Sequence, residues 1–445
     1  MLTVRCGFVQ FRHFGYVMRN TGGRLFKKSQ AGEGAITPAQ AVSTALAGTV
    51  GTGNIVGTAQ AIAMGGCGAV FWLWLAALLG MAVKYAEVTL SIKFRQRDEN
   101  GDQVGGPMYY ISKGMGKKWG WLAASFALLA LPASFGIGNM SQVNSIVGSV
   151  AASMSLFLPL SRRDEYFLRW ILGIALALLV AFILLGGIKR IGSLAEKLVP
   201  FMALCYISMC IIVLICHAQK LPHSLALILR SAFEPQAIGG GASGILLKET
   251  VAWGMRRSAF SNEAGLGSAA IAHAAAEAAS PVDQGIYGIF EVFMDSIVLC
   301  TLTALTIICS GTHISFGTMP GSELVAAAFA TVLGQKAARL FVAAVLTLFA
   351  FTTVLGWALY GARCTQFLFG TKAIRTYQLL FSLVIVMGCV SPIDLVWDIS
   401  DTFNGLMAIP NFIALFALSG LAGRLTKAYF SQEGHGGKKD SSLIL

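Results

Sequence analysis

The chain has 445 residues, of which 56% are hydrophobic and 12% are charged, and its mean hydropathy is +0.69. Soluble domains carry about 25% charged residues, so this composition excludes an ordinary soluble protein. Long apolar blocks of about 20 residues instead predict an all-α integral membrane protein. The net charge of +12 is also typical of nucleic-acid-binding proteins. Because the charges fall between apolar blocks, we attribute them to the basic inner face of a membrane protein and expect no nucleic-acid partner.

The nine cysteines show no C-x-x-C or Cys/His ligand spacing, which predicts neither a metal cluster nor a disulfide framework. The sequence also contains no recognisable nucleophile–base set or metal-binding motif of an integral-membrane enzyme. We therefore expect a protein that is not an enzyme and has no cofactor.

Three kinds of segment follow one another along the chain. Residues 1–37 are basic and amphipathic and predict a cytoplasmic segment with a helix at the membrane interface. Ten apolar blocks then predict a transmembrane domain over residues 38–421, with an extra helix from Glu323 to Leu333 between blocks seven and eight. Residues 422–445 predict a polar cytoplasmic tail. The ten blocks lie at 38–64, 68–94, 119–152, 168–187, 193–217, 243–272, 286–310, 338–363, 376–391 and 394–421.

With the N-terminus inside, 25 of the 33 Lys and Arg residues fall on the inner side, including Arg256 and Arg257. This bias supports cytoplasmic N- and C-termini. Ten spans divide into two repeats of five, 38–217 and 243–421, and an odd number inverts the second repeat relative to the first.

The first block of each repeat is interrupted by glycine and polar residues. A helix in lipid is unwound only where it is buried in protein or lines a cavity, so these paired breaks predict the binding site of a transporter. In the first break, AGTVGTGNIVG at 47–57, unwinding frees N–H groups that suit a carboxylate and carbonyls that suit a small cation. Thr49, Thr52 and Asn54 add neutral oxygens. Glycine-mediated helix packing by Gly53 and Gly57 is the competing interpretation.

The second break, GMRRSAFSNEAGLG at 254–267, holds an aromatic and an acidic residue. Phe260 is equally consistent with a wall of a side-chain pocket and with core packing. Glu263 is costly at membrane depth and must face protein or water. We consider a gating role, in which it pairs with Arg256, Arg257 or the first break, and slightly favour a salt bridge at the cytoplasmic end.

Polar residues elsewhere complete the candidate set. Gln142 lies in the third block, where hydrogen bonding between helices is the alternative interpretation. Thr352 and Thr353 in the eighth block are candidate cation ligands, and Trp357 one turn later is a candidate lid of the pocket. Glu87, Glu291 and Asp295 are interpreted as structural, because they are expected near span ends or inner faces.

Together these stretches resemble the alanine/glycine:cation symporter family. The resemblance is carried by FVQFRHFG, GAVFWLWLAALLGMAVKYAE (68–87), GGPMYYI (105–111), GNMSQVNSI (138–146) and the two broken blocks ITPAQAVSTALAGTVGTGNIVG (36–57) and SAFSNEAGLGSAAIAHAAA (258–276). It implies the leucine-transporter-like fold, a five-plus-five inverted repeat, and the bacterial cytoplasmic (inner) membrane. Family members begin with a further hydrophobic segment, so we expect this chain to lack a peripheral eleventh helix.

The resemblance also implies the site residues. The backbone of Thr52 and Gly53 would hold the substrate carboxylate, Gln142 and Asn262 would lie near its amino group, and Phe260 and Trp357 would bound its side chain. Sodium would lie between the Ala47 and Val50 carbonyls and the Thr352 and Thr353 hydroxyls, with a second cation position near Thr49 and Asn54.

We therefore expect sodium-coupled symport of a small neutral amino acid, alanine or glycine, by alternating access. The abundance of small residues around the breaks favours a small pocket. Proton-coupled transport, uncoupled transport and a passive channel remain as alternatives, and a channel is disfavoured because no ring of filter residues is seen.

Overall fold

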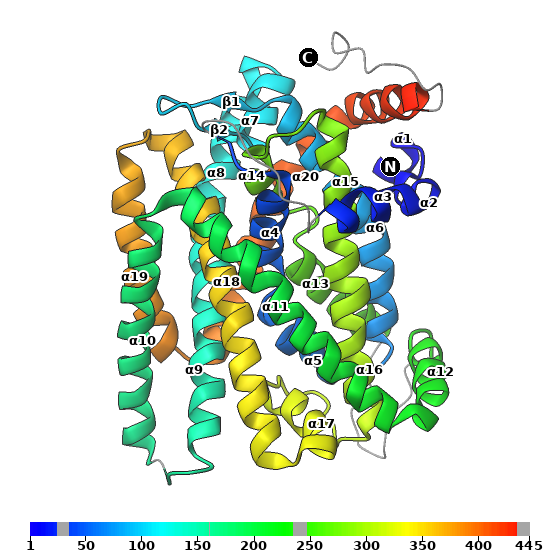
Figure 1. The fold of residues 1–445 in the computed structure, drawn as a ribbon, viewed down its shortest axis with the longest axis vertical. Helices are drawn as coiled ribbons and strands as arrows, with labels where there is room; N and C mark the ends of the chain where they lie inside the picture. Colours follow the sequence, from blue (N-terminus) through cyan, green and yellow to red (C-terminus); the bar gives the residue numbers. More distant parts are fainter. Residues whose placement is uncertain (25–34, 160, 235–246, 434–445) are drawn as a thin grey trace.

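The computed structural model describes residues 1–24, 35–159, 161–234 and 247–433. Nearly all of this part of the chain is helical, and its one pair of strands is a short antiparallel hairpin. The longer helices stand side by side along the long axis of the molecule (Figure 1).

The elements up to residue 234 belong to the first half of the fold. They are α1 (Leu2–Arg5), α2 (Val9–Arg12), α3 (Phe14–Thr21), α4 (Pro38–Thr49), α5 (Thr58–Gly65), α6 (Ala69–Lys93), β1 (Gln96–Arg97), β2 (Gln103–Val104), α7 (Pro107–Tyr109), α8 (Gly120–Phe135), α9 (Ser141–Met154), α10 (Arg162–Leu184), α11 (Gly187–Cys216) and α12 (Leu221–Ser231).

The second half is formed by the elements from residue 247 onward. They are α13 (Leu247–Asn262), α14 (Ser268–Ala274), α15 (Pro281–Val292), α16 (Thr301–Ser310), α17 (Glu323–Leu333), α18 (Gln335–Phe369), α19 (Ala373–Val390) and α20 (Ile393–Glu433).

The ten predicted spans are all found in the described residues. Eight helices are long and apolar enough to cross a membrane. The other two spans are the interrupted pairs α4–α5 and α13–α14, in which each half is too short to cross alone. The extra helix expected from Glu323 to Leu333 is α17, with the same bounds.

The two interrupted pairs run in opposite directions. α13 packs against α5, whereas α14 packs against α4, so the first half of one pair lies beside the second half of the other. This antiparallel arrangement is what an inverted repeat requires. The predicted fold, all-α with two discontinuous helices in a five-plus-five repeat, is confirmed.

The two ends of the bundle differ. The hairpin β1–β2, α1–α3 and the end of α20 lie at one end, and α17 lies at the other (Figure 1). We refer to these as the hairpin end and the α17 end. Arg256 and Arg257 lie in α13, on the α17 side of the second break, so counting them with the inner residues was wrong.

Several local features differ from the expectations. The N-terminal segment forms three short helices instead of one. The backbone turns at Gly7 and Phe8, both with positive φ, between α1 and α2, and leaves the helix again at His13 between α2 and α3. α20 continues past the expected boundary at 421 to Glu433, and Tyr429 at its end is buried. Residues 25–34, the start of the sixth block (243–246) and the tail from 434 lie outside the described residues.

Candidate substrate and cation site

The first break occupies the turn between α4 and α5. The backbone leaves the helix at Val50 (φ −76°, ψ 89°). The freed Gly51 N–H donates to Asn54 Oδ1 at 3.0 Å, and the Thr52 N–H donates to Gln142 Oε1 at 3.2 Å. All five residues are buried. Side chains therefore satisfy the unwound backbone here, as burial in a membrane requires.

The second break turns through left-handed backbone. Glu263 has φ +57° and Gly265 has φ +97°, and a non-glycine residue with positive φ commonly marks a functional site. The Gly265 N–H donates to Glu87 Oε1 at 3.0 Å. Asn411 Nδ2 donates both to the Gly265 carbonyl (2.8 Å) and to Glu87 Oε1 (2.6 Å). α6 and α20 thus fix the shape of this break.

The two breaks meet at a buried carboxylate. A Cβ on Gly53 would lie only 3.0 Å from Ser261 Cα, so glycine permits this close approach. Asp295, in the π-helical segment after α15, accepts from Asn54 Nδ2 (2.7 Å) and Ser261 Oγ (3.0 Å) through Oδ1. The sequence interpretation missed this role. An ionisable residue inside an apolar block was the signal, since such residues mark ion or substrate pathways.

The structure brings together two of the predicted sodium ligands. Thr353 Oγ1 lies 3.4 Å from the Val50 carbonyl oxygen, which joins α18 to the first break. Both hydroxyls also donate to the Phe349 carbonyl of their own helix, Thr353 at 3.1 Å and Thr352 at 2.9 Å. Thr352 Oγ1 does not reach the first break and lies 3.6 Å from Met202 Sδ in α11. Thr353 is therefore the better placed of the two hydroxyls.

The other predicted cation ligands are Ala47, Thr49 and Asn54, and their contacts differ. Ala47 is buried in the last turn of α4. The Thr49 hydroxyl donates to the Ala45 carbonyl at 3.2 Å, which is back-bonding within its own helix. Asn54 bonds to Asp295. That contact is made by Asn54 Nδ2, while Asn54 Oδ1 accepts from the Gly51 N–H at 3.0 Å. A carboxylate suits a hard cation, so the Asp295 side chain marks a second candidate cation position, and Asn54 would have to turn its oxygen to join it.

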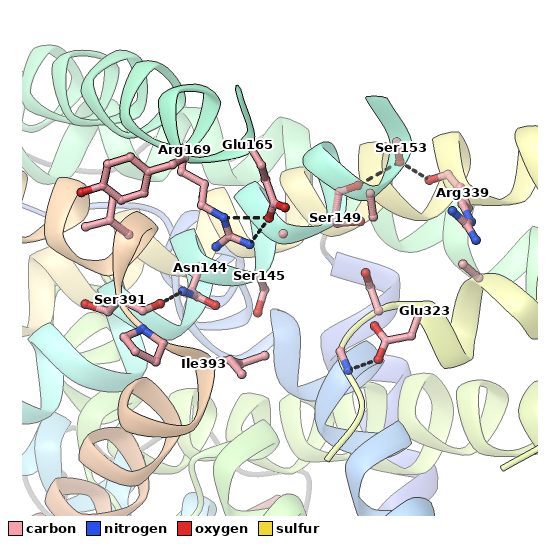
Figure 2. Close-up of a pocket in the computed structure, with 18 of the residues that line it drawn as sticks. Asn144, Ser145, Ser149, Ser153, Glu165, Arg169, Glu323, Arg339, Ser391 and Ile393 are labelled. Carbon is pink, nitrogen blue, oxygen red and sulfur yellow. Dashed lines mark hydrogen bonds and ion pairs between the residues drawn. The ribbon is translucent and has the colours of Figure 1, made fainter. Parts of the chain in front are cut away.

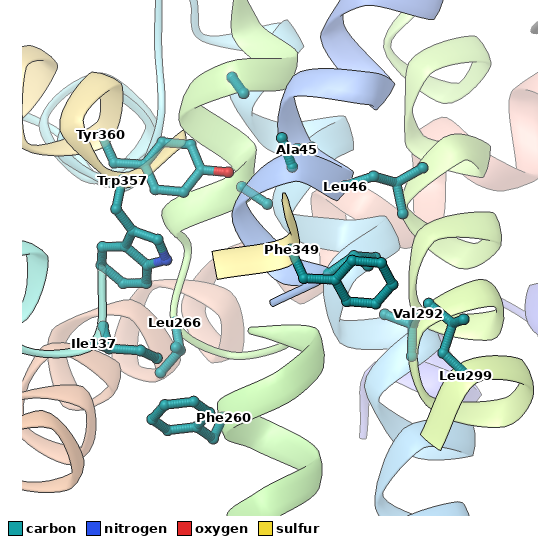
Figure 3. Close-up of a cluster of buried hydrophobic side chains, with 14 of the residues drawn as sticks. Ala45, Leu46, Ile137, Phe260, Leu266, Val292, Leu299, Phe349, Trp357 and Tyr360 are labelled. Atoms are coloured by element: carbon teal, nitrogen blue, oxygen red, sulfur yellow. The ribbon is translucent and has the colours of Figure 1, made fainter. Parts of the chain in front are cut away.

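Aromatic side chains stand beside both breaks (Figure 3). The Trp357 Nε1–H donates to Glu263 Oε1 at 2.7 Å, and the backbone at Gly138 lies so close that a Cβ there would collide with Trp357. The Phe260 ring packs on Trp397 with centroids 4.8 Å apart. Trp357 and Phe260 therefore have positions consistent with pocket walls.

Asn262 is occupied by contacts within the protein. Its Nδ2 donates to the hydroxyls of Ser258 (3.1 Å) and Ser296 (3.0 Å), and its Oδ1 accepts from the Ala264 N–H (2.9 Å). The side chain caps the end of α13. A contact with a substrate amino group would require one of these bonds to open.

Two buried hydroxyls near the first break have no partner among the described residues. They are Thr52 Oγ1 and the phenol oxygen of Tyr360. A Cβ on Gly48 of α4 would touch that phenol oxygen, which places Tyr360 against the helix end. A buried polar group without a hydrogen bond destabilises the folded protein by about 1–3 kcal/mol. A polar ligand that bonds to these hydroxyls would remove that destabilisation.

The expected pairing of Glu263 with an arginine is not present and that hypothesis was wrong. Arg257 Nη2 lies 3.0 Å from Asp401 Oδ2 in α20, and Arg256 lies 3.8 Å from the same atom. The buried Arg257 guanidinium also stacks over Trp397 at 4.7 Å. Glu263 faces Trp357 and Ser268 instead, at the centre of the bundle.

A buried triad of Lys84, Glu291 and His273 supports the short helix α14. Glu291 lies 3.4 Å from Lys84 Nζ and 3.1 Å from His273 Nε2, and all three side chains are fully buried. Charges inside a membrane protein pair in this manner because an isolated charge is costly there. The triad joins α6, α14 and α15, and sequence reasoning did not identify it because its members are far apart in the chain.

Comparisons with known proteins agree with this architecture. The sequence profile of the sodium:alanine symporter family matches residues 1–443. An uncharacterized transporter of Haemophilus influenzae is 42% identical over 97% of this chain and 91% of its own length. The sodium/alanine symporter AgcS of Methanococcus maripaludis is 42% identical over 96% and 91%.

Among solved structures, MhsT in complex with L-phenylalanine superposes with a TM-score of 0.56 at 14% identity, covering 89% of this chain and 99% of MhsT. That likeness concerns the fold alone. The match over nearly the whole chain shows that this multi-pass membrane transporter belongs to the sodium:alanine symporter family.

Proposed function

We propose that the protein imports a small neutral amino acid, alanine or glycine, together with Na⁺ across the bacterial cytoplasmic membrane. The observation that carries this proposal is the meeting of two oppositely directed broken helices at a buried set of oxygen atoms. Broken helices at the middle of an inverted repeat are where transporters bind substrate and coupling ion. In this orientation the hairpin end, with the N-terminus and the end of α20, faces the cytoplasm.

The binding roles follow from the contacts. The Thr52 and Gly53 backbone would hold the substrate carboxylate, with Gln142 releasing the Thr52 N–H as the carboxylate arrives. Sodium would bind between the Val50 carbonyl and Thr353, 3.4 Å apart here. Asp295 would favour a second cation near Asn54 by its negative charge.

Alternating access needs a closure on each side of the site. At the hairpin end, Arg363 of α18 pairs with Asp98 and Asp102 of the hairpin segment, each at 3.3 Å. Toward the α17 end, Arg257 pairs with Asp401 over the Phe260 ring. We propose that these two ion pairs open in turn. Sodium drives import only if it binds one state better than the other.

Uptake of radiolabelled alanine into proteoliposomes tests the proposal. Uptake should require an inward sodium gradient and should cease when choline replaces sodium. Glycine should compete for uptake, and glutamine should not. Uptake that needs no sodium and is driven by a proton gradient would show that the proton is the coupling ion. Single-channel conductance in bilayers would show that the protein is a channel and not a symporter.

A further inference from the structure

A cavity of about 750 Å³, lined by both apolar and charged side chains, opens at the α17 end, away from the central site. It is formed by α9, α10, the loop before α17, the first turns of α18 and the junction of α19 and α20 (Figure 2). Its size is that of a ligand pocket for a small molecule.

One face of α9 lines the cavity with hydroxyl groups. Ser145, Ser149 and Ser153 follow one another at four-residue spacing, which places them on one side of the helix. The Ser145 hydroxyl donates to the Ser141 carbonyl and the Ser153 hydroxyl to the Ser149 carbonyl, both within α9. Their oxygens therefore keep acceptor capacity. This stripe ends one turn from Gln142, which holds the first break.

Five charged side chains line this space, namely Arg162, Glu165, Arg169, Glu323 and Arg339. Arg339 of α18 and Glu323 of α17 line both this cavity and a second one of about 360 Å³. Arg169 at the same cavity is already bound to Glu165 at 2.8 Å. Among the described residues Arg339 and Glu323 form no ion pair, and Glu323 Oε1 accepts only the Gly321 N–H at 2.7 Å.

An α-amino acid carries both charges that would complete this pair. A guanidinium binds a carboxylate through two parallel hydrogen bonds, and a carboxylate with nearby hydroxyl oxygens accepts the three N–H groups of an ammonium. We propose that Arg339 and Glu323 form an outer binding station for a zwitterionic amino acid, from which it moves along the serine face of α9 to the central site. This inference rests on the proposed function and on its orientation.

The test compares charge variants of the station in proteoliposomes. Arg339→Gln should raise the KM for alanine about 5- to 20-fold while Vmax stays within twofold, because capture is impaired and the central site is not. Lys336→Gln is the matched control: it removes the same charge one turn away on α18, at a residue that does not line either cavity. It should keep the parent KM.

Glu323→Gln should raise KM as well, and the exchanged pair Arg339→Glu with Glu323→Arg should recover at least half of the loss. Arg339→Lys keeps the charge but loses the two parallel hydrogen bonds of the guanidinium, so its KM should lie between those of the parent and Arg339→Gln. If Arg339→Gln does not insert, Glu323→Gln carries the test. A parent-like KM in the charge-removing variants that insert would overturn the station.

A readout without transport separates this inference from the proposed function. Ser149→Cys, in a background stripped of reactive cysteines, should be alkylated by a charged thiol reagent in detergent. Alanine should slow the alkylation at least threefold without sodium, and should not do so when Arg339→Gln is added. If alanine protects Ser149→Cys but no uptake occurs, the symport proposal is contradicted and the outer station is supported. If uptake occurs without protection, symport is supported and the outer station is contradicted.

Discussion

Replacing Asp295 with asparagine isolates the charge at the place where the two broken helices meet. Asparagine has nearly the same shape. Its oxygen can still accept from Asn54 Nδ2 and Ser261 Oγ, which now donate to Asp295 Oδ1 at 2.7 and 3.0 Å. Ser296 Oγ, which donates to Oδ2 at 2.7 Å, can turn to accept from the new amide. The hydrogen-bond network therefore survives and only the negative charge is lost.

The expected loss of sodium affinity follows from Coulomb's law. Two unit charges 4 Å apart attract by about 4 kcal/mol at an effective dielectric constant of 20. Because sodium also gives up water to bind, we expect about half of this, roughly 1.5–2.5 kcal/mol, to appear in binding. That is about a 10- to 70-fold rise in the sodium concentration for half-maximal uptake.

The assay is alanine uptake at a series of sodium concentrations, with thermal unfolding in detergent as the control for folding. Asp295→Asn without sodium should unfold at or above the parent temperature, since it removes an unpaired buried charge. Asp295→Ala should unfold at a lower temperature than the parent, because it removes the acceptor of three hydrogen bonds. A half-maximal sodium concentration within twofold of the parent in Asp295→Asn would refute a cation at Asp295.

Three further predictions concern the same site. Thr353→Ala should raise the half-maximal sodium concentration about 3- to 10-fold, because its hydroxyl faces the Val50 carbonyl; an unchanged sodium titration with intact insertion would move that cation elsewhere. Gly51→Ala should abolish uptake, since its Cβ would lie 2.3 Å from Thr353 Oγ1; substantial transport would show that the break relaxes around a methyl group. Trp357→Phe should lower the free energy of unfolding by about 1.5–3 kcal/mol, because it removes the 2.7 Å hydrogen bond to Glu263. It should also allow larger amino acids to compete for uptake. Competition by larger amino acids no stronger than in the parent would contradict the role of Trp357 as a pocket wall.

The main features of the fold could be predicted from the sequence because they depend on local composition. Apolar length sets the number of spans, and glycine clusters mark where a helix unwinds, as at 47–57. The helix Glu323–Leu333 was predicted with its observed bounds because an apolar helical stretch lies between polar and glycine-containing segments.

Much of the candidate site could not be predicted, because its contacts join residues far apart in the chain. Asp295 meets Asn54 across 241 positions, and Arg257 meets Asp401 across 144. The sequence interpretation placed Asp295 near a span end or an inner face, whereas a π-helical segment holds it within the bundle, beside both breaks.

Hydrophobic length and glycine content act locally, so they suffice to predict a protein that crosses the membrane in two inverted halves, each opened by a broken helix. Which side chains satisfy those breaks depends on packing between distant segments. A buried backbone group takes whichever partner packing brings within about 3 Å, and here these are Gln142, Glu87 and Asn411.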